Sequence, residues 1–410
     1  MQNWSQLFAT RADRMVASEI RELLKVLDQP EMISFAGGIP DPALFPAEEF
    51  KAAYQELFEQ DDHQAALQYS VSEGYKPLRK WISGRMALQG IACSEDNILI
   101  TSGAQQALDY LGKLFLSAGD TALVGWPTYL GALQAFNAYE PAYQRLDAHG
   151  NRSVKDYQAK AKSSGGTVKF AYASTDFANP TGQTLTLHER KGILDLAEQL
   201  DIAVIEDAPY QCLRFEGKAL PSLLELDIAR SGDIEATRTI YCGSFSKTLS
   251  PGLRLGWVCA ATPVIHQMVL IKQAADLNSS TINQMVMTKV AESCFDEHVE
   301  KICVVYKERR DHMIAALASH MPEGVTWSRP EGGMFIWVEL PENMDAAAIL
   351  KTSLEVANVA FVPGHAFFAD RSGRNCMRLN FTSCGPDKIE TGISRLGRLL
   401  ADLISSGSVT

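Results

Sequence analysis

The chain has 410 residues, of which 46% are hydrophobic and 21% charged, and its formal net charge at pH 7 is −11. One hydrophobic core rarely extends over so many residues, so the length favours two associated domains. The acidic balance argues against nucleic acid or an anionic membrane surface as the main partner. No apolar run reaches the roughly 18 residues that a membrane-spanning helix needs. The segment Met1–Arg14 mixes acidic and basic side chains, unlike a signal or transit peptide, so we expect a cytoplasmic protein.

The eight cysteines and eight histidines are dispersed along the chain, and no two cysteines are separated by two residues. This spacing gives neither a zinc signature nor a redox motif. Several cysteines lie within apolar runs, where cysteine behaves as a small hydrophobic residue. We therefore expect reduced, structural thiols and no bound metal.

In chain order, the first predicted element is an amphipathic helix at Ser18–Leu27. The turn-rich segment Phe35–Pro40 follows it. Because neither segment has the alternation of strands and helices that begins near residue 95, we expect the first forty residues to join a small domain.

From about residue 95 to 260, short apolar runs alternate with longer segments whose apolar residues recur at intervals of three and four, such as Gln105–Leu116 and Leu187–Leu200. Strands that are apolar on both faces and separated by helices indicate a mostly parallel sheet covered on two sides. The predicted strands are Asn97–Thr101, Thr121–Trp126, Val168–Ser174, Ile202–Glu206, Thr239–Gly243 and Leu255–Ala260.

A long helix is predicted from Asn283 to Met321. The sequence therefore predicts an α/β fold with a large domain of residues 46–295 and a smaller, discontinuous α+β domain of residues 1–45 and 296–410. The predicted strands of the smaller domain are Met334–Leu340, Asn358–Val362 and Cys376–Phe381.

The segment Gly243–Arg254 carries a lysine, Lys247, just after an apolar strand. A lysine at a buried strand end loses solvation, which lowers its pKa and makes the amine nucleophilic towards a carbonyl. Ser244, Ser246 and Arg254 are residue types that hold a phosphate. Taken alone, the segment is equally compatible with a solvated loop.

Asp207 follows another apolar strand, at the position where open α/β sheets place ligand contacts. A buried carboxylate needs a cation, and a protonated pyridine nitrogen would serve. Tyr210, three residues later, is placed to donate a hydrogen bond to a ring oxygen. The alternative is an acidic N-cap before a helix.

Two further strand ends carry weaker signals. Asn179 precedes Pro180 and Gly182, a combination that presents the amide at the sheet edge. The segment Thr101–Leu108 joins a strand to a helix with small residues at the junction, where free backbone N–H groups make a phosphate site. It contains neither a Walker loop nor the dinucleotide-binding glycine pattern.

The order of these motifs resembles the fold type I pyridoxal-phosphate aminotransferases of class I/II, over the range Ser18 to Leu399. Within that group the chain is most similar to the branch of 2-aminoadipate aminotransferase and kynurenine aminotransferase II. The segments that carry this similarity are Ala17–Leu24, Ser34–Pro40, Leu67–Ser70 and Pro330–Phe335.

The resemblance implies pyridoxal 5'-phosphate (PLP) as cofactor and assigns catalytic roles to three residues. Lys247 would form the Schiff base with the cofactor and move the substrate Cα proton. Asp207 would keep the pyridine nitrogen protonated, and Tyr210 would act with Asn179 on the ring oxygen. The other cofactor residues implied are Ser102, Gly103, Ala104, Gln105, Tyr129, Ser244, Ser246, Arg254 and, reaching the phosphate of a neighbouring subunit, Tyr69. A homodimer with shared active sites follows from the role of Tyr69.

Arg378 corresponds to the arginine that binds the substrate α-carboxylate through two parallel hydrogen bonds. Asn179 and Gly38 are the further substrate-binding residues implied, and Arg21 is either a contact for a distal carboxylate or a solvent-facing helix residue.

The predicted function is ping-pong transfer of the amino group of an L-amino acid to a 2-oxo acid, with 2-oxoglutarate as the expected acceptor. The donor would be 2-aminoadipate-like, aromatic or branched-chain. Thr175 and Ala178 replace the Pro and Gln of the family motif Pro-x-Phe-Gln-Asn-Pro, and Asp176 adds a charge nearby. Ala208 stands where an Asp is common, and these changes leave the substrate open. The alternatives are another PLP reaction on the same scaffold, β-elimination or decarboxylation, or a non-catalytic effector-binding protein.

Overall fold

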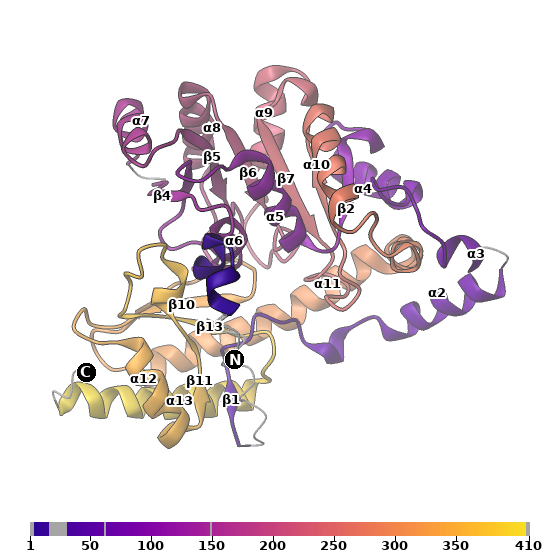
Figure 1. Cartoon of the computed structure of the whole chain (residues 1–410). Helices are drawn as coiled ribbons and strands as arrows, with labels where there is room; N and C mark the ends of the chain where they lie inside the picture. Colours follow the sequence, from indigo (N-terminus) through magenta and orange to yellow (C-terminus); the bar gives the residue numbers. More distant parts are fainter. Residues whose placement is uncertain (1–3, 16–30, 61–62, 148–149, 407–410) are drawn as a thin grey trace.

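The computed structural model describes residues 4–15, 31–60, 63–147 and 150–406, and its centre is a seven-stranded sheet (Figure 1). Among the described strands of this sheet, β8 alone runs in the direction opposite to the others, so the expected mostly parallel sheet is confirmed. The order across the sheet is β2 (Ile98–Thr101), β8 (Gly256–Cys259), β7 (Thr239–Ser244), β6 (Ala203–Asp207), β5 (Val168–Ala173), β3 (Thr121–Val124) and β4 (Ala142–Arg145).

Helices cover both faces of this sheet, and its central strands are therefore buried on both sides. The side chains of α5 (Ala104–Phe115), α6 (Leu130–Asn137) and α10 (Thr262–Ala275) form one hydrophobic core with the strands. A second core lies on the other face and includes α7 (Val154–Ser163), α8 (Leu187–Leu200) and α9 (Leu223–Ser231).

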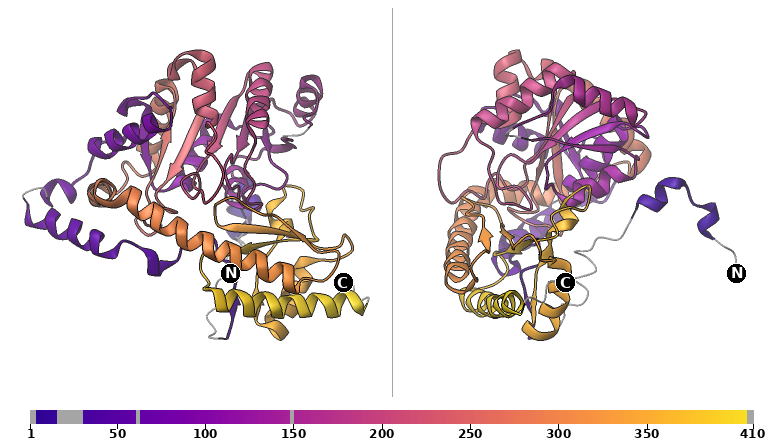
Figure 2. Two further views of the ribbon diagram at one scale, coloured as in Figure 1. Left: turned by 180° about the vertical axis from the view of Figure 1, so that it is seen from behind. Right: turned by 90° about the vertical axis from the view of Figure 1, so that its left-hand side faces the viewer.

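The second unit is built around a four-stranded antiparallel sheet and two long helices. The strand order is β12 (Val362–Pro363), β13 (Cys376–Asn380), β10 (Phe335–Glu339) and β9 (Thr326–Trp327). Helix α13 (Pro386–Ser405) lies alongside α11 (Thr281–His320), as Figure 2 shows from behind. The N-terminal strand β1 (Ile33–Ser34) pairs in parallel with β11 (Val359–Ala360), and α12 (Ala346–Thr352) precedes β11 in the chain.

Helix α11 has 40 residues and is therefore about 60 Å long. It contacts α13 in the small unit and, in the large unit, α2 (Ala47–Glu59), α3 (His63–Ala66) and α4 (Lys76–Leu88). The expected boundary between residues 295 and 296 falls inside this continuous helix. We retain the division into 46–295 and 1–45 plus 296–410 as a proposal.

Several predicted elements differ from the observed ones. The run Asn358–Val362 forms two strands, β11 and β12, which pair with different partners. Strand β4 was not expected, because its residues Ala142–Arg145 mix polar and apolar side chains and pair only with β3 at the sheet edge. The helix predicted at Ser18–Leu27 lies outside the described residues.

The described N-terminal segment, residues 4–15, projects away from the body of the molecule (Figure 2, right). Arg14 connects it to the large unit, since its Nη1 donates to the carbonyl of Pro141 over 3.2 Å. No helix in the described ranges is both long and apolar enough to cross a membrane.

Candidate active site

The predicted site residues meet at one edge of the seven-stranded sheet. Strands β2, β5, β6 and β7 all point their carboxyl ends to this edge, because β2 and β7 are both antiparallel to β8. Gly103 follows β2, Asn179 follows β5, Asp207 ends β6 and Lys247 follows β7. The topology therefore brings together residues that are up to 144 positions apart (247 − 103 = 144).

The first component is a cationic loop at the start of α5. Gly103 has φ +81° and precedes the first helical turn, and a Cβ there would lie 2.4 Å from Arg254 Nη2. Arg254 Nη2 also donates to the carbonyl of Ser102 over 3.4 Å. On the adjacent strand end, the Ser246 N–H donates to Ser244 Oγ over 3.1 Å. The helix N-terminus and the guanidinium together favour an anion such as a phosphate.

Ala104 and Gln105 open α5 beside Tyr129, the residue that precedes α6. Gln105 Nε2 donates to the carbonyl of Gly131 over 2.6 Å, and the Tyr129 hydroxyl lies 3.5 Å from Gln105 Oε1. The ring of Tyr129 thus borders the same loop that carries Gly103, as expected for a residue that stacks on a cofactor.

An ion pair between the buried Lys272 and the exposed Asp276 supports this loop, and the sequence analysis did not identify it. Lys272 has no exposed side-chain surface and donates to Asp276 over 2.8 Å and to Gln106 Oε1 over 3.2 Å. Gln106 Oε1 in turn accepts the backbone N–H of Ser102 over 2.8 Å. The i,i+4 spacing of Lys272 and Asp276 was the only signal in the sequence, and it is common on helix surfaces.

Asp207 is buried, and one of its two carboxylate oxygens has no hydrogen-bond partner. Tyr172 donates to Asp207 Oδ2 over 2.6 Å, while Oδ1 is left without a partner. Burial raises the pKa of Asp207 to about 6, and the hydrogen bond from Tyr172 opposes part of this rise. The free oxygen therefore favours a cationic N–H donor. Tyr172 was missed because a tyrosine in an apolar strand is indistinguishable from a core residue.

Asn179, Tyr210 and Arg378 form a buried hydrogen-bonded chain. Arg378 Nη1 donates to Asn179 Oδ1 over 2.8 Å, and Asn179 Nδ2 donates to the Tyr210 hydroxyl over 3.3 Å. Arg378 Nη2 donates to the carbonyl of Ala36 over 2.9 Å, and its Nε has no partner. Burial raises the pKa of Tyr210 above its ordinary value, so this hydroxyl stays protonated.

Arg378 is 1% exposed, and its guanidinium lies 4.2 Å from the ring centroid of Phe335 and 5.2 Å from that of Phe367. Burial lowers its pKa to about 10, which still leaves it charged at neutral pH. A buried cation whose partners are neutral oxygens favours an anionic ligand, and the planar fork suits a carboxylate.

Lys247 completes the site. Its Nζ donates to the carbonyl of Gly38 over 2.8 Å. Gly38 also lies beside Arg378, because a Cβ added to this glycine would lie within 4 Å of the guanidinium. Burial, with the charges of Arg378 and Arg254, lowers the pKa of Lys247 to about 8. An amine with this pKa is partly neutral, and therefore nucleophilic, near physiological pH.

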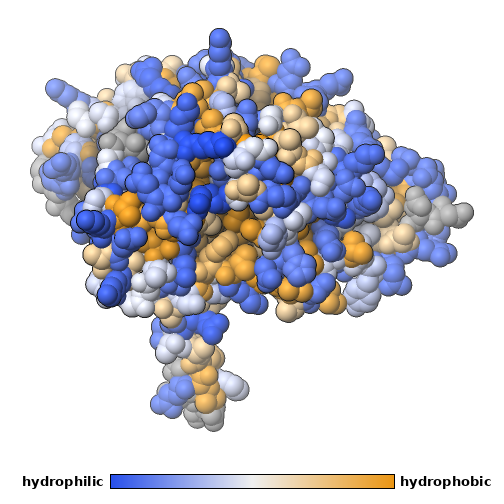
Figure 3. All heavy atoms as spheres, turned by 90° about the horizontal axis from the view of Figure 1, so that it is seen from above, coloured by the Kyte–Doolittle hydropathy of each residue, from blue (hydrophilic) through white to orange (hydrophobic). Residues whose placement is uncertain are grey.

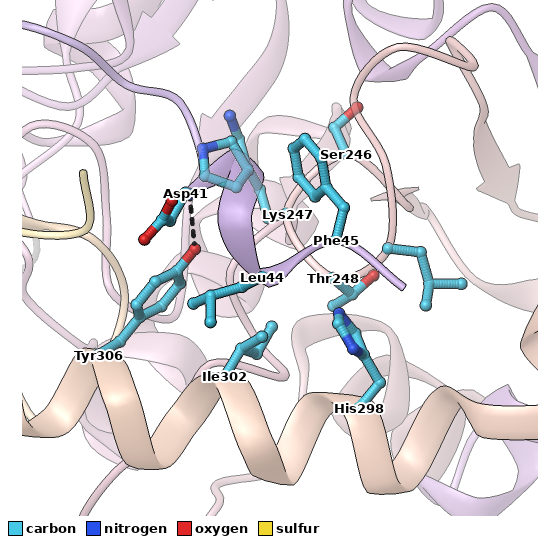
Figure 4. A pocket seen from close by; sticks show the side chains of 11 residues that line it. Asp41, Leu44, Phe45, Ser246, Lys247, Thr248, His298, Ile302 and Tyr306 are labelled. Carbon is cyan, nitrogen blue, oxygen red and sulfur yellow. Dashed lines mark hydrogen bonds between the residues drawn. The ribbon is translucent and has the colours of Figure 1, made fainter. Parts of the chain in front are cut away.

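A small pocket lies along the side chain of Lys247 (Figure 4). Its walls come from three parts of the chain: the strand end around Lys247, the segment from Pro40 to Phe45, and one face of α11. In this pocket the N–H of Asp41 donates to the Tyr306 hydroxyl over 3.1 Å, which fastens the segment to the helix. The small unit thereby contributes to the burial that lowers the pKa of Lys247. The residues that line it also include Ser246, Thr248, His298 and Ile302.

Two predicted site residues are not part of this cluster. Tyr69 is 79% exposed on the surface of the subunit. Arg21 lies outside the described residues. The described ranges contain no group of three His, Cys, Asp or Glu side chains that would hold a metal ion, and all eight cysteines are free thiols.

The model of the family "Aminotransferase class I and II" matches residues 30–396 of the chain. Aromatic-amino-acid aminotransferase 1 of Thermococcus litoralis is 41% identical, over 98% of this chain and 95% of that protein. The chain belongs to the class I and II aminotransferases. The 2-aminoadipate transaminase of Thermus thermophilus is 39% identical over 98% of both chains. The crystal structure of Pyrococcus horikoshii kynurenine aminotransferase, solved with PMP, has a TM-score of 0.89 and 41% identity over 98% of both chains.

This membership confirms the family and the fold type I architecture expected from the sequence, and the cofactor of this aminotransferase is PLP. The residues present fit that cofactor. Asp207 Oδ1 is a buried acceptor without a partner, which suits a protonated pyridine nitrogen. The loop at Gly103, with Arg254, suits the phosphate, and Lys247 supplies the amine for the aldehyde.

Proposed function

We propose that the chain transfers the amino group of an L-amino acid to a 2-oxo acid by ping-pong transamination, with Lys247 as the central catalytic residue. The observation that carries this proposal is the arrangement of three ionisable groups of different kinds at one sheet edge. These groups are the amine of Lys247 with its lowered pKa, the half-satisfied carboxylate of Asp207 and the buried guanidinium of Arg378. When bound, PLP supplies the electron sink for the reaction.

Each residue then has a distinct task. Arg378 would bind the α-carboxylate of the substrate and thereby orient the Cα–H bond. The free amine of Lys247 would act as the general base that removes the Cα proton and then as the general acid that returns it. Asp207 would hold the proton on the ring nitrogen, and Asn179 and Tyr210 would bind the ring oxygen.

The relatives bear on the amino donor. The names of the Thermococcus, Thermus and Pyrococcus proteins refer to aromatic amino acids, 2-aminoadipate and kynurenine. We propose a donor from the same set, aromatic or 2-aminoadipate-like, with branched-chain amino acids as further candidates and 2-oxoglutarate as acceptor. The rings of Phe335 and Phe367 beside Arg378 make the surroundings of the carboxylate site apolar, which supports an apolar donor.

A half-reaction assay tests the proposal. The purified PLP form is mixed with single L-amino acids in the absence of acceptor, and its absorption spectrum is recorded. We expect an aromatic donor or 2-aminoadipate to convert the visible band of the enzyme-bound cofactor to the near-ultraviolet band of pyridoxamine phosphate, with one 2-oxo acid formed per site. Adding 2-oxoglutarate should restore the visible band.

Other outcomes of this assay identify the alternatives. Continuous release of ammonia without acceptor would indicate β-elimination, and release of carbon dioxide would indicate decarboxylation. Binding of an amino acid without conversion would indicate an effector-binding protein. Each of these results contradicts transamination.

We also propose that the active unit is a homodimer in which Tyr69 reaches the partner's site. In one subunit Tyr69 and Leu67 are 79% and 69% exposed, and the projecting N-terminal segment adds apolar side chains that are about as exposed (Figure 3). Exposed apolar groups of this extent are typical of surfaces covered by a partner. The exposed apolar side chains of the projection are Trp4, Leu7, Phe8 and Met15. The cytoplasmic location stays a prediction.

Mixed dimers test this arrangement. Tyr69→Ala and Lys247→Ala chains are each expected to have little activity. Refolded together, they form dimers in which one site has both an intact Lys247 and the partner's Tyr69, so we expect activity well above that of either variant. No gain in activity on mixing, with dimers shown by sedimentation, would contradict a shared site.

A further inference from the structure

Asp176, at the variable position of the family motif, belongs to a buried ionic cluster next to the active site. Asp176 is 2% exposed and forms two ion pairs, with Arg190 Nη2 at 3.0 Å and with Arg214 Nη2 at 2.7 Å. Arg190 is fully buried, and its other donors bind the carbonyls of Leu185 and Pro221. Arg190 is therefore tied to the large unit, whereas Arg214 has donors left for other partners.

Arg214 uses those donors to reach the small unit. Its Nη1 lies 3.2 Å from Glu331 Oε2, and its backbone forms an isolated antiparallel bridge with Gly332. Its guanidinium also lies 4.6 Å from the ring centroid of Phe177. One arginine thus contacts Asp176 and Phe177 of the loop after β5 and Glu331 of the segment that leads into β10.

These two segments are in close contact along their length. A Cβ at Gly332 would lie 2.5 Å from Phe177 Cζ, so no larger residue fits there without movement. Phe177 itself has φ +51°, a conformation that costs energy for a bulky residue and persists only when its surroundings impose it. Arg214, which covers the ring of Phe177, is part of those surroundings.

One of these segments carries a residue of the carboxylate site, and the other leads into the strand that pairs with the second. Asn179 lies three residues after Asp176 in the same loop. Arg378 lies on β13, where it is directly opposite Trp337 of β10, the strand that follows Glu331. The hydrogen bond of 2.8 Å between Asn179 and Arg378 therefore depends on the relative position of the loop and the small sheet.

We propose that Arg214 is a positioning residue for the substrate carboxylate: by joining Asp176 to Glu331, it sets the Asn179 loop against the sheet that carries Arg378. This inference rests on the proposed function, because it takes Arg378 and Asn179 as the carboxylate site. Arg214 itself touches neither of them in the contacts described above. Its effect is on the geometry of the pair, and therefore on the affinity for both the amino acid and the 2-oxo acid, which share the carboxylate.

The main test is Arg214→Met, which keeps much of the aliphatic stem and removes the guanidinium. We expect KM for donor and acceptor to rise about tenfold each, the effect of losing one charge-assisted hydrogen bond to the substrate. PLP content should stay close to that of the wild type, since the phosphate contacts and Lys247 are unchanged and Asn179 is the one ring contact that shifts. The matched control is Arg230→Met, which removes an arginine whose ion pair with Asp195 joins α8 and α9 away from the site. It should leave both KM values unchanged.

Two further variants keep the test decisive if Arg214→Met folds poorly. Glu331→Gln removes only the half-exposed partner and should raise both KM values by a smaller factor. Arg214→Lys keeps the positive charge but replaces the planar guanidinium with a single ammonium group, which cannot pair with Asp176 and Glu331 at once. Its KM values should therefore lie between those of the wild type and Arg214→Met. Wild-type KM values for Glu331→Gln would overturn the proposal.

A double-mutant cycle separates positioning from general destabilisation. In an Asn179→Ala background, the pair that Arg214 positions no longer exists, so Arg214→Met should add little to KM. An undiminished effect in that background, or a loss of PLP content parallel to the rise in KM, would overturn the positioning role.

Arg378→Lys shows which of the two proposals fails. If it leaves KM for the donor unchanged, the carboxylate site of the proposed function is wrong. If Arg378→Lys raises KM and Arg214→Met does not, only the role of Arg214 is wrong.

Discussion

Lys247→Ala is expected to lower kcat for transamination by at least about 10⁴-fold, because it removes both the nucleophile for the cofactor and the base that acts on the substrate Cα. The amine of Lys247 has a pKa of about 8, lowered by burial and by Arg378 and Arg254. At pH 8 roughly half of this amine is neutral, whereas less than about 1% of the amine of an ordinary lysine is neutral at the same pH. The measurement is single-turnover conversion of a saturating donor by the PLP-loaded variant.

The control for this prediction is Lys247→Arg. Arginine keeps the positive charge and the length of the side chain but stays protonated, so it has no free amine to act as base. We expect it to be as inactive as Lys247→Ala while binding carboxylate inhibitors normally through Arg378. Substantial transamination by either variant would contradict the role of Lys247.

The site residues that could be predicted from the sequence are those that follow strands directly. Asp207 and Lys247 end or follow buried parallel strands, whose carboxyl ends meet at one edge whatever the intervening helices are. Helix α8 was predicted at its observed bounds because its apolar residues recur at intervals of three and four. In these cases the residues close to each position in the sequence were sufficient to predict where it lies in the fold.

The residues that could not be predicted act through contacts between distant segments. Tyr172 points to Asp207 only because β5 and β6 are neighbours in register, and Lys272 reaches Gln106 across 166 positions. Asp176 was recognised as an added charge beside the site. That two arginines neutralise it depends on where Arg190 and Arg214 lie in the fold, which a single sequence does not contain.

Asp207→Asn is expected to lower kcat by about 100-fold, the effect of about 3 kcal/mol for the loss of one member of a buried charge pair. Asparagine preserves the shape of the side chain and the hydrogen bond from Tyr172, but it carries no charge to hold a proton on the ring nitrogen. Oδ1 of Asp207 has no other partner, so the charge has no other evident use. The measurement is kcat with saturating PLP, and near-normal turnover would contradict the assignment.

Tyr172→Phe is the matched variant for this prediction, because it leaves the carboxylate in place and removes one hydroxyl. The hydrogen bond from Tyr172 lowers the pKa of Asp207, which burial raises to about 6, so its loss should raise that pKa further. Asp207 must be ionised to act, and activity is therefore lost as the pH falls through the pKa that Asp207 has in the PLP-bound enzyme, where the ring cation lowers it. In Tyr172→Phe the acid limb of the profile of kcat/KM against pH should lie at higher pH, whereas in Asp207→Asn the limb that belongs to this carboxyl should disappear. A general loosening of the core would lower activity at all pH values and would produce neither change, so the pair of profiles separates an electrostatic role of Asp207 from a structural one.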